Sequence, residues 1–249
     1  MGCQVAEWPG GQAGCLVAMT RQPGNSTTMN LRIFDTVDQL ISGAARTIIE
    51  RAGDGASIAL SGGSTPKPLY ELLGRSDELL HKRITWVVVD ERYVPITDPQ
   101  SNAGMIERTL FANGIPPGHQ FLRFKTELND PAATAREFER EWRELGLGDL
   151  DIVILGIGDD GHTASLFPGT SALEVEDHIA VEVFVPKLDM WRVTITKPVI
   201  RAAKLRIVLA EGESKREILK QIRDGADYPI AQATRGVETW WLIDRAAAG

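Results

Sequence analysis

The chain has 249 residues, enough for one large α/β domain, and its 43% hydrophobic and 24% charged residues are ordinary for a soluble globular protein. The formal net charge of −7 argues against nucleic acid as the main partner, although a local basic cluster can still bind a small anion. No apolar run approaches the roughly 18 residues that a membrane-spanning helix needs.

The first 30 residues differ in composition from the rest of the chain. They carry only Glu7 and Arg21 as charges. Their apolar patch is too short for a secretory signal and lacks a basic lead-in. We expect residues 1–30 to form a disordered leader. Both cysteines, Cys3 and Cys15, lie in it, so the remaining domain has no disulfide framework and a cytoplasmic location is expected.

Apolar runs and helical periodicities alternate along residues 31–249. The expected elements, in chain order, are a helix from Val37 with a capping box at 36–39, a strand over 57–60, a helix ending at Gly74, a strand over 84–89, helices over 103–111 and 133–145, strands over 152–155, 180–185, 191–196 and 205–210, a helix ending at Arg223, and a strand over 238–243. This alternation predicts a single α/β domain with a mainly parallel sheet and helices on both faces.

The first strand runs directly into Ser61-Gly62-Gly63-Ser64-Thr65-Pro66, and a helix follows. Glycines let the backbone approach a ligand, hydroxyls donate hydrogen bonds, and a helix N-terminus favours an anion. We therefore expect the cradle loop, residues 61–65, to bind phosphate; the alternative is an ordinary tight turn with a hydroxyl cap. The Gly-Lys-Ser/Thr ending of a nucleotide-binding loop is missing, so ATP is not implied.

The next strand delivers Asp90-Glu91-Arg92 at its carboxyl end. Arg92 is a candidate to orient a carboxylate or phosphate through its planar guanidinium, and Asp90 a candidate to hold Arg92 or a loop in place. Taken alone, however, the segment favours the interpretation that these residues are simply solvated. Ser101 or Asn102 is expected to cap the helix that follows.

A glycine-rich stretch follows the strand over 152–155; we call it the histidine loop, residues 156–168. Its first six residues have the Gly-x-Gly-x-x-Gly letters of a dinucleotide fingerprint. That fingerprint should open a long helix in the first strand–helix–strand unit, whereas this one comes late and runs into Pro168. A nicotinamide cofactor is not expected.

His162 is one of four histidines and lies two residues after Asp160. A nearby carboxylate can fix the imidazole tautomer and raise its basicity, as in a general acid/base. The alternative is a polar surface histidine. No metal-ligand spacing and no Gly-x-Ser-x-Gly elbow is present, so neither a metal site nor a covalent serine mechanism is expected.

Arg192 and Lys215 complete a possible anion site. Taken alone, each of them is better interpreted as a surface charge. Together with the cradle loop, they predict a basic pocket in an otherwise acidic protein.

Four motifs in order carry a resemblance to a known family. They are Ser61-Gly62-Gly63-Ser64-Thr65-Pro66, Asp90-Glu91-Arg92-Tyr93-Val94-Pro95 with Ser101-Asn102, Gly158-Asp159-Asp160-Gly161-His162-Thr163-Ala164-Ser165-Leu166-Phe167-Pro168, and Arg192-Val193-Thr194-Ile195-Thr196. The set, spanning about residues 30–245, resembles the 6-phosphogluconolactonases. The resemblance implies a Rossmann-like fold and hydrolysis of 6-phospho-D-glucono-1,5-lactone in the oxidative pentose phosphate pathway. It also implies no cofactor and no required metal. A monomer or weak homo-oligomer is expected.

The resemblance also implies roles for individual residues. His162 takes the acid/base role, with Asp160 beside it and Arg92 at the developing charge. Substrate and phosphate contacts fall to the cradle loop and to Asp90, Asn102, Arg192 and Lys215. The stretch before Arg192 has fewer prolines than the family pattern.

Two other functions stay open. A sugar-phosphate deaminase or isomerase would share the fold, but the deaminases carry Phe-Asn-Glu-Pro where this chain has Ser165-Leu166-Phe167-Pro168. A non-catalytic sugar-phosphate sensor would keep the cradle loop and could dispense with Asp160 and His162.

Overall fold

A computed structural model describes residues 4–5, 15–18 and 30–249 of the chain. Among these residues, nine strands form the main sheet in the order β1-β2-β3-β12-β11-β8-β4-β5-β7. Their bounds are β1 Gln4–Val5, β2 Cys15–Ala18, β3 Asn30–Phe34, β4 Ala56–Leu60, β5 Ile84–Val88, β7 His119–Leu122, β8 Ile152–Leu155, β11 Leu205–Ala210 and β12 Thr239–Asp244. All pairings from β3 to β7 are parallel, so the expected mainly parallel α/β architecture is confirmed.

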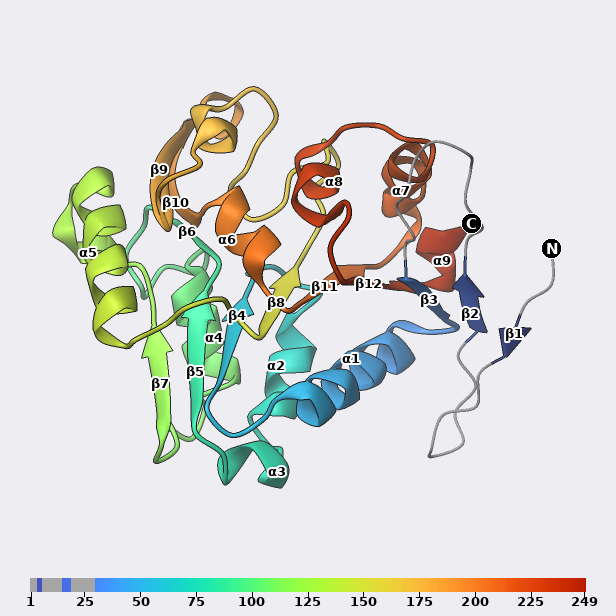
Figure 1. Ribbon diagram of the computed structural model, residues 1–249, viewed down its shortest axis with the longest axis horizontal. Coiled ribbons are helices and arrows are strands. Elements are labelled where there is room, and N and C mark those ends of the chain that lie inside the picture. The colour runs from blue at the N-terminus through green and yellow to red at the C-terminus, as the bar shows by residue number, and fades with distance from the viewer. Residues whose placement is uncertain (1–3, 6–14, 19–29) are drawn as a thin grey trace.

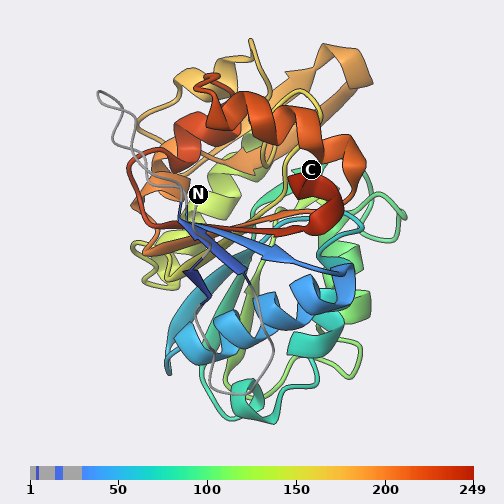
Figure 2. The same ribbon diagram turned by 90° about the vertical axis from the view of Figure 1, so that its right-hand side faces the viewer.

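The central strands are covered by helices on both faces. Every residue of β4, β8 and β11 is buried, as their continuous apolar sequences predict. Helices α1, α2 and α4 lie on one face, and α6, α7 and α8 lie on the other (Figures 1 and 2). The helices of the described residues are α1 Val37–Arg51, α2 Lys67–Leu73, α3 Asp77–Leu80, α4 Asn102–Thr109, α5 Pro131–Glu144, α6 Lys197–Ala202, α7 Arg216–Arg223, α8 Pro229–Thr234 and α9 Arg245–Ala248.

Helix α1 begins with the expected capping box in a variant form. The Thr36 side chain accepts a hydrogen bond from the Gln39 N–H at 3.2 Å. The Gln39 side chain reaches back one residue beyond the cap and accepts from the Asp35 N–H at 3.1 Å. Two otherwise unsatisfied donors at the helix start are thereby paired. The helix buries Leu40 and Ile48 against the sheet, in keeping with the predicted apolar spacing.

A second, antiparallel sheet lies beside the first, in the order β6-β10-β9. It consists of β6 Asp90–Arg92, β9 Ala180–Val185 and β10 Met190–Ile195. The two strands expected over 180–185 and 191–196 exist, but they leave the parallel sheet because the four-residue turn between them can only join antiparallel neighbours. Val89 links the two sheets, since its N–H donates to Leu60 O and its carbonyl accepts from the Ile195 N–H.

Several short elements were not predicted from the sequence. Strand β7 and helices α6, α8 and α9 have at most six residues each, too few for a clear periodicity. Strands β1 and β2 fall within the segment expected to be a disordered leader, and β2 pairs with β3. Residues 1–3, 6–14 and 19–29 of that segment lie outside the described residues. Within the described ranges, no helix is long and apolar enough to cross a membrane.

Candidate active site

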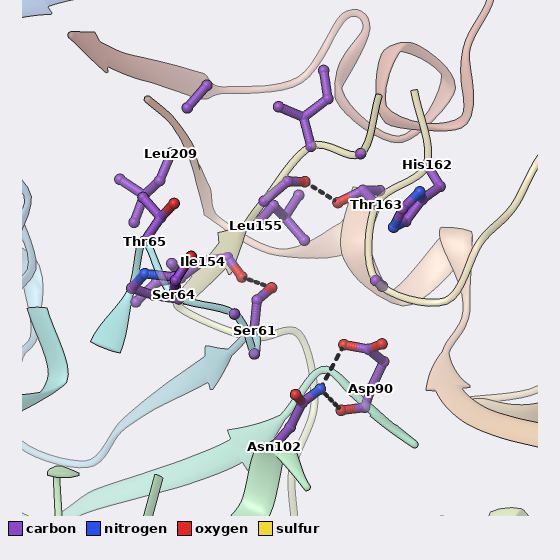
Figure 3. A pocket seen from close by; sticks show the side chains of 18 of the residues that line it. Ser61, Ser64, Thr65, Asp90, Asn102, Ile154, Leu155, His162, Thr163 and Leu209 are labelled. Carbon is purple, nitrogen blue, oxygen red and sulfur yellow. Dashed lines mark hydrogen bonds between the residues drawn. The ribbon is translucent and has the colours of Figure 1, made fainter. Parts of the chain in front are cut away.

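A pocket opens at the carboxyl ends of β4 and β8, where the strand order reverses. From β4 the chain proceeds outward to β5 and β7, then returns to the other side of β4 with β8 and proceeds to β11 and β12. Such a switch point is where open α/β sheets bind ligands. The cradle loop follows β4 and the histidine loop follows β8, so the two predicted motifs face each other across it (Figure 3).

The structure brings nearly all of the predicted site residues to this one pocket. Those that line it are Ser61, Gly62, Gly63, Ser64, Thr65, Asp90, Arg92, Asn102, His162, Arg192 and Lys215. Asp160 does not line the pocket but contacts His162 directly.

Hydrogen bonds at both ends hold the cradle loop in shape. Ser61 Oγ donates to Ile154 O at 2.6 Å, which ties the loop to β8, and Tyr70 OH donates to Ser61 O at 2.6 Å. Thr65 Oγ1 donates to Glu211 Oε1 at 2.7 Å. The loop is therefore fixed from three directions before any ligand arrives.

The backbone of the cradle loop is left open toward the pocket. No described residue accepts a hydrogen bond from the N–H groups of residues 62–65. A Cβ at Gly62 would lie 1.7 Å from Asn102 Oδ1, so only glycine allows the close approach of Asn102. Gly63 has φ +112°, a conformation that side chains rarely adopt. These exposed donors suit an anion.

Asp90 is not solvated; it is 5% exposed and held by three partners. Ser165 Oγ donates to its Oδ2 at 2.6 Å, and Asn102 Nδ2 donates to its Oδ1 at 3.3 Å and to its carbonyl at 2.7 Å. Arg192 Nη1 lies 3.8 Å from Oδ2. The predicted alternative of a simple surface charge is wrong for this residue.

Arg92 and Arg192 lie directly opposite each other on β6 and β10. Like charges at such positions repel. The Nε atoms of both guanidinium groups are buried, and no described residue accepts from them. Arg92 Nη1 donates to Gln100 O at 2.6 Å, and burial lowers the pKa of Arg192. Two close, incompletely paired guanidinium groups make a site that an anionic ligand would stabilise.

His162 and Asp160 form a hydrogen-bonded pair. His162 Nδ1 lies 2.5 Å from Asp160 Oδ1, and the His162 N–H donates to the same oxygen at 3.2 Å. Burial raises the pKa of Asp160, but hydrogen bonds from Lys187 and His162 outweigh it and lower the pKa to about 2. The ionised carboxylate must accept, so Nδ1 carries the hydrogen and Nε2 keeps its lone pair.

The surroundings of His162 keep the imidazole neutral. Burial lowers its pKa, although Asp160 opposes the shift. Its ring stacks on Phe167 with centroids 4.1 Å apart. A Cβ at Gly158 would lie 2.0 Å from His162 Nδ1, so a glycine at this position makes room for the ring. A neutral, oriented imidazole beside a pocket is suited to take a proton.

Four residues of the site were not singled out from the sequence. Glu91 is 1% exposed and accepts hydrogen bonds from the Ser101 hydroxyl and from three backbone N–H groups, those of Arg92, Asn102 and Ala103. Lys187 forms an ion pair with Asp160, Ser165 binds Asp90, and Glu211 binds Thr65. Glu91 and Ser165 belong to motifs noted above, Lys187 lies in the stretch before Arg192, and Glu211 had no sequence signal.

The histidine loop is not a dinucleotide-binding turn. Residues 156–170 contain no helix, and the next helical turn, Ser171–Glu174, is a short 3₁₀ segment. The loop instead folds on itself, with the Gly158 N–H donating to His162 O at 2.9 Å. Within the described ranges, no group of three or more His, Cys, Asp or Glu side chains is arranged to hold a metal ion.

Residues 31–241 match the family of glucosamine-6-phosphate isomerases/6-phosphogluconolactonase. The chain is 35% identical over 231 residues to a 6-phosphogluconolactonase of Haemophilus influenzae, covering 88% of this chain and 98% of the relative.

Two solved structures resemble the fold closely. A 6-phosphogluconolactonase from Trypanosoma cruzi has a TM-score of 0.79 at 28% identity, covering 91% of this chain and 98% of the other. A monomeric glucosamine-6-phosphate deaminase has a TM-score of 0.74 at 25% identity, covering 88% and 99%.

Proposed function

The chain belongs to the glucosamine-6-phosphate isomerase/6-phosphogluconolactonase family, and from this membership we infer that it is an enzyme that hydrolyses 6-phospho-D-glucono-1,5-lactone to 6-phospho-D-gluconate. The reaction belongs to the oxidative pentose phosphate pathway. The observation that carries the inference is the likeness to named lactonases over 88% of the chain. The pocket is in keeping with this function, because it places a His–Asp pair beside hydrogen-bond donors and cationic side chains that can bind an anion.

The geometry of His162 supports the chemistry that we assign to it. Nε2 takes a proton from water as the water oxygen attacks C1 of the lactone, and a tetrahedral oxyanion forms. When the bond between C1 and the ring oxygen breaks, the imidazolium returns the proton to that oxygen, which leaves as a hydroxyl group. Asp160 keeps the imidazole in the tautomer that can do this.

The remaining residues divide between the two ends of the substrate. The open N–H groups of the cradle loop, with Lys215 and Arg192, hold the phosphate on C6. Arg92 and backbone N–H groups of the loops that line the pocket stabilise the oxyanion at C1. Lys215 Nζ lies 2.5 Å from Asp159 Oδ1, so the phosphate replaces that carboxylate when it binds. Remote binding energy thereby places C1 at His162.

The position that distinguishes a deaminase is filled differently here. A deaminase needs a glutamate where this chain has Phe167. Phe167 is 2% exposed and packs its ring against His162, so no carboxylate lies at this point. The observation favours lactone hydrolysis over proton transfer between C1 and C2.

An assay with two substrates tests the function. Formation of 6-phosphogluconate from freshly prepared lactone is followed against the spontaneous rate, and ammonia release is followed from glucosamine 6-phosphate. We expect acceleration with the lactone alone. Acceleration with glucosamine 6-phosphate alone would mean a deaminase, and binding of both without turnover would mean a sensor.

The location in the cytoplasm and the oligomeric state, monomer or weak homo-oligomer, are further parts of this proposal. Cell fractionation tests the first. Light scattering on the eluting protein tests the second, and a tight dimer at nanomolar concentration would contradict it.

A further inference from the structure

Lys187 lies at the tip of the β9–β10 hairpin and reaches the catalytic pair. It belongs to the short turn Pro186–Leu188, which Asp189 closes in a left-handed conformation at φ +47°. Its ammonium forms an ion pair with Asp160 Oδ2 and lies 4.8 Å from the centroid of the Phe167 ring. The same hairpin carries Arg192, which lines the pocket.

The two oxygens of Asp160 have separate partners. Oδ1 faces His162, and Oδ2 faces Lys187. An exposed ion pair contributes little to stability, but this one fixes the rotation of a carboxylate that in turn fixes an imidazole. Loss of the ammonium would let the carboxylate rotate, so the imidazole would lose its fixed orientation while the negative charge of Asp160 stays beside it.

Lys187 also balances the charges around His162. The charged groups near the imidazole come from four segments, and they are Asp160 in its own loop, Asp90 at the start of β6, Lys187 in the hairpin turn, and Arg192 on β10 beside Phe167. Both carboxylates favour the imidazolium. The Lys187 charge opposes them and helps to keep the pKa of His162 low.

We propose that Lys187 is a positioning residue for the proposed lactonase reaction: it clamps Asp160 from the hairpin and sets the pH at which His162 becomes a base. The proposal rests on the proposed function, because it assigns Lys187 to the same catalytic pair. The β9–β10 hairpin then has two roles, because it supplies Arg192 to the pocket and Lys187 to the His162–Asp160 pair.

The test compares three variants. Lys187→Met removes the charge and keeps the length of the side chain, and Lys187→Arg keeps the charge. Lys204→Met is the matched control, because Lys204 forms a comparable ion pair at 2.7 Å with Asp151, which is neither a pocket residue nor a member of the catalytic pair. kcat and KM are measured from about pH 5 to about pH 7, where the acidic limb of the profile reports a base.

In Lys187→Met we expect kcat to fall about tenfold with KM changed less than about twofold, and the acidic limb to move up by about one pH unit. Lys187→Arg should keep most of the activity, and Lys204→Met all of it. An unmoved acidic limb would overturn the proposal. A raised KM with unchanged kcat would also overturn it, because Lys187 would then bind substrate.

A second readout needs no turnover and separates this proposal from the proposed function. The chain has four histidines, so the His162 resonance can be assigned by its loss in His162→Gln and titrated by NMR. The midpoint should rise by about one pH unit in Lys187→Met. If the wild type does not hydrolyse the lactone, this titration still decides the clamp: a midpoint that stays or falls rejects it.

Discussion

At the scale of single residues, the proposed mechanism depends on one imidazole that is neutral and correctly oriented. Burial lowers the pKa of His162, and the ionised Asp160 accepts a hydrogen bond from Nδ1–H. An imidazole buried without a carboxylate would lose its orientation, and one beside an unbalanced carboxylate would hold its proton too tightly to act as a base near neutral pH.

Replacement of the imidazole gives a direct prediction. His162→Gln removes the base but keeps a polar side chain of similar size, so kcat should fall by about a thousandfold with KM nearly unchanged. Steady-state kinetics on fresh lactone measure both parameters. His81→Gln, at an exposed histidine that does not line the pocket, serves as the control and should be normal. Near-normal turnover in His162→Gln would remove the histidine from the mechanism.

The pH profile follows from the same residue. Because the neutral imidazole is the active form, kcat/KM rises as the pH rises through the pKa of His162 and then levels off. Burial lowers that pKa, so the midpoint should lie below the ordinary value of about 6.5. Asp160, with its pKa of about 2, stays ionised over the whole range. Initial rates corrected for spontaneous hydrolysis test this; a midpoint above the ordinary value would contradict it.

At the scale of elements, a buried carboxylate joins β6 to the start of α4. Glu91 accepts from the N–H groups of Asn102 and Ala103, where the helix begins, and the negative charge suits the helix N-terminus. Ser101 caps the helix, donating to Glu91 and accepting from Gly104, so Asn102 is free to hold Asp90 instead. The orientation of Asp90 in the pocket thus depends on the hydrogen bonds between Glu91 and the start of α4, which lie outside the pocket.

Glu91→Gln tests this connection. The glutamine side chain would bring its own N–H donors up against the backbone N–H groups that now donate to the Glu91 carboxylate. We therefore expect a loss of about 2 kcal/mol in the free energy of unfolding, or roughly 4–8 °C in Tm. Glu107→Gln, at an exposed carboxylate of the same helix, should change stability by less than about 0.5 kcal/mol. Calorimetry compares the two variants. Equal melting temperatures would show that Glu91 does not support the helix start.

At the scale of the whole molecule, two sheets of different kinds meet at one pocket. The parallel sheet supplies the cradle loop and the histidine loop, and the small antiparallel sheet supplies both arginines. A ligand that touches all of them should stabilise the native state by mass action. Arg92 and Arg192 should make this stabilisation by the ligand larger. Their positive charges repel each other in the free protein and are incompletely paired there, and a bound anion would reduce that repulsion.

We therefore expect the product to raise the melting temperature. 6-Phosphogluconate at about a hundred times its Kd should add about 2.7 kcal/mol, or roughly 5–10 °C. Gluconate, which lacks the phosphate, should have little effect, and Lys215→Gln should reduce the shift. A melting scan with the two ligands decides the matter; equal shifts would mean that the phosphate lies outside this pocket.

The sequence by itself determined the class of fold, the two pocket loops and the histidine with its carboxylate. Buried strands and cradle-type turns are local patterns, and Asp160 and His162 are two residues apart, so no long-range contact was needed to find them. The likeness to named lactonases confirmed the family that those motifs indicated.

Only the tertiary structure decided which distant side chains meet. The sequence of β9 and β10 predicts two strands but not the sheet to which they belong. Because they belong to the antiparallel sheet, Arg192 lies opposite Arg92 and Lys187 pairs with Asp160. The hydrogen bonds of Glu211 and Ser165 could not be predicted either, because their partners Thr65 and Asp90 lie far away in the chain. Hydrogen bonds and charge balance depend on distances in space, and a pattern of residue types along the chain does not contain them.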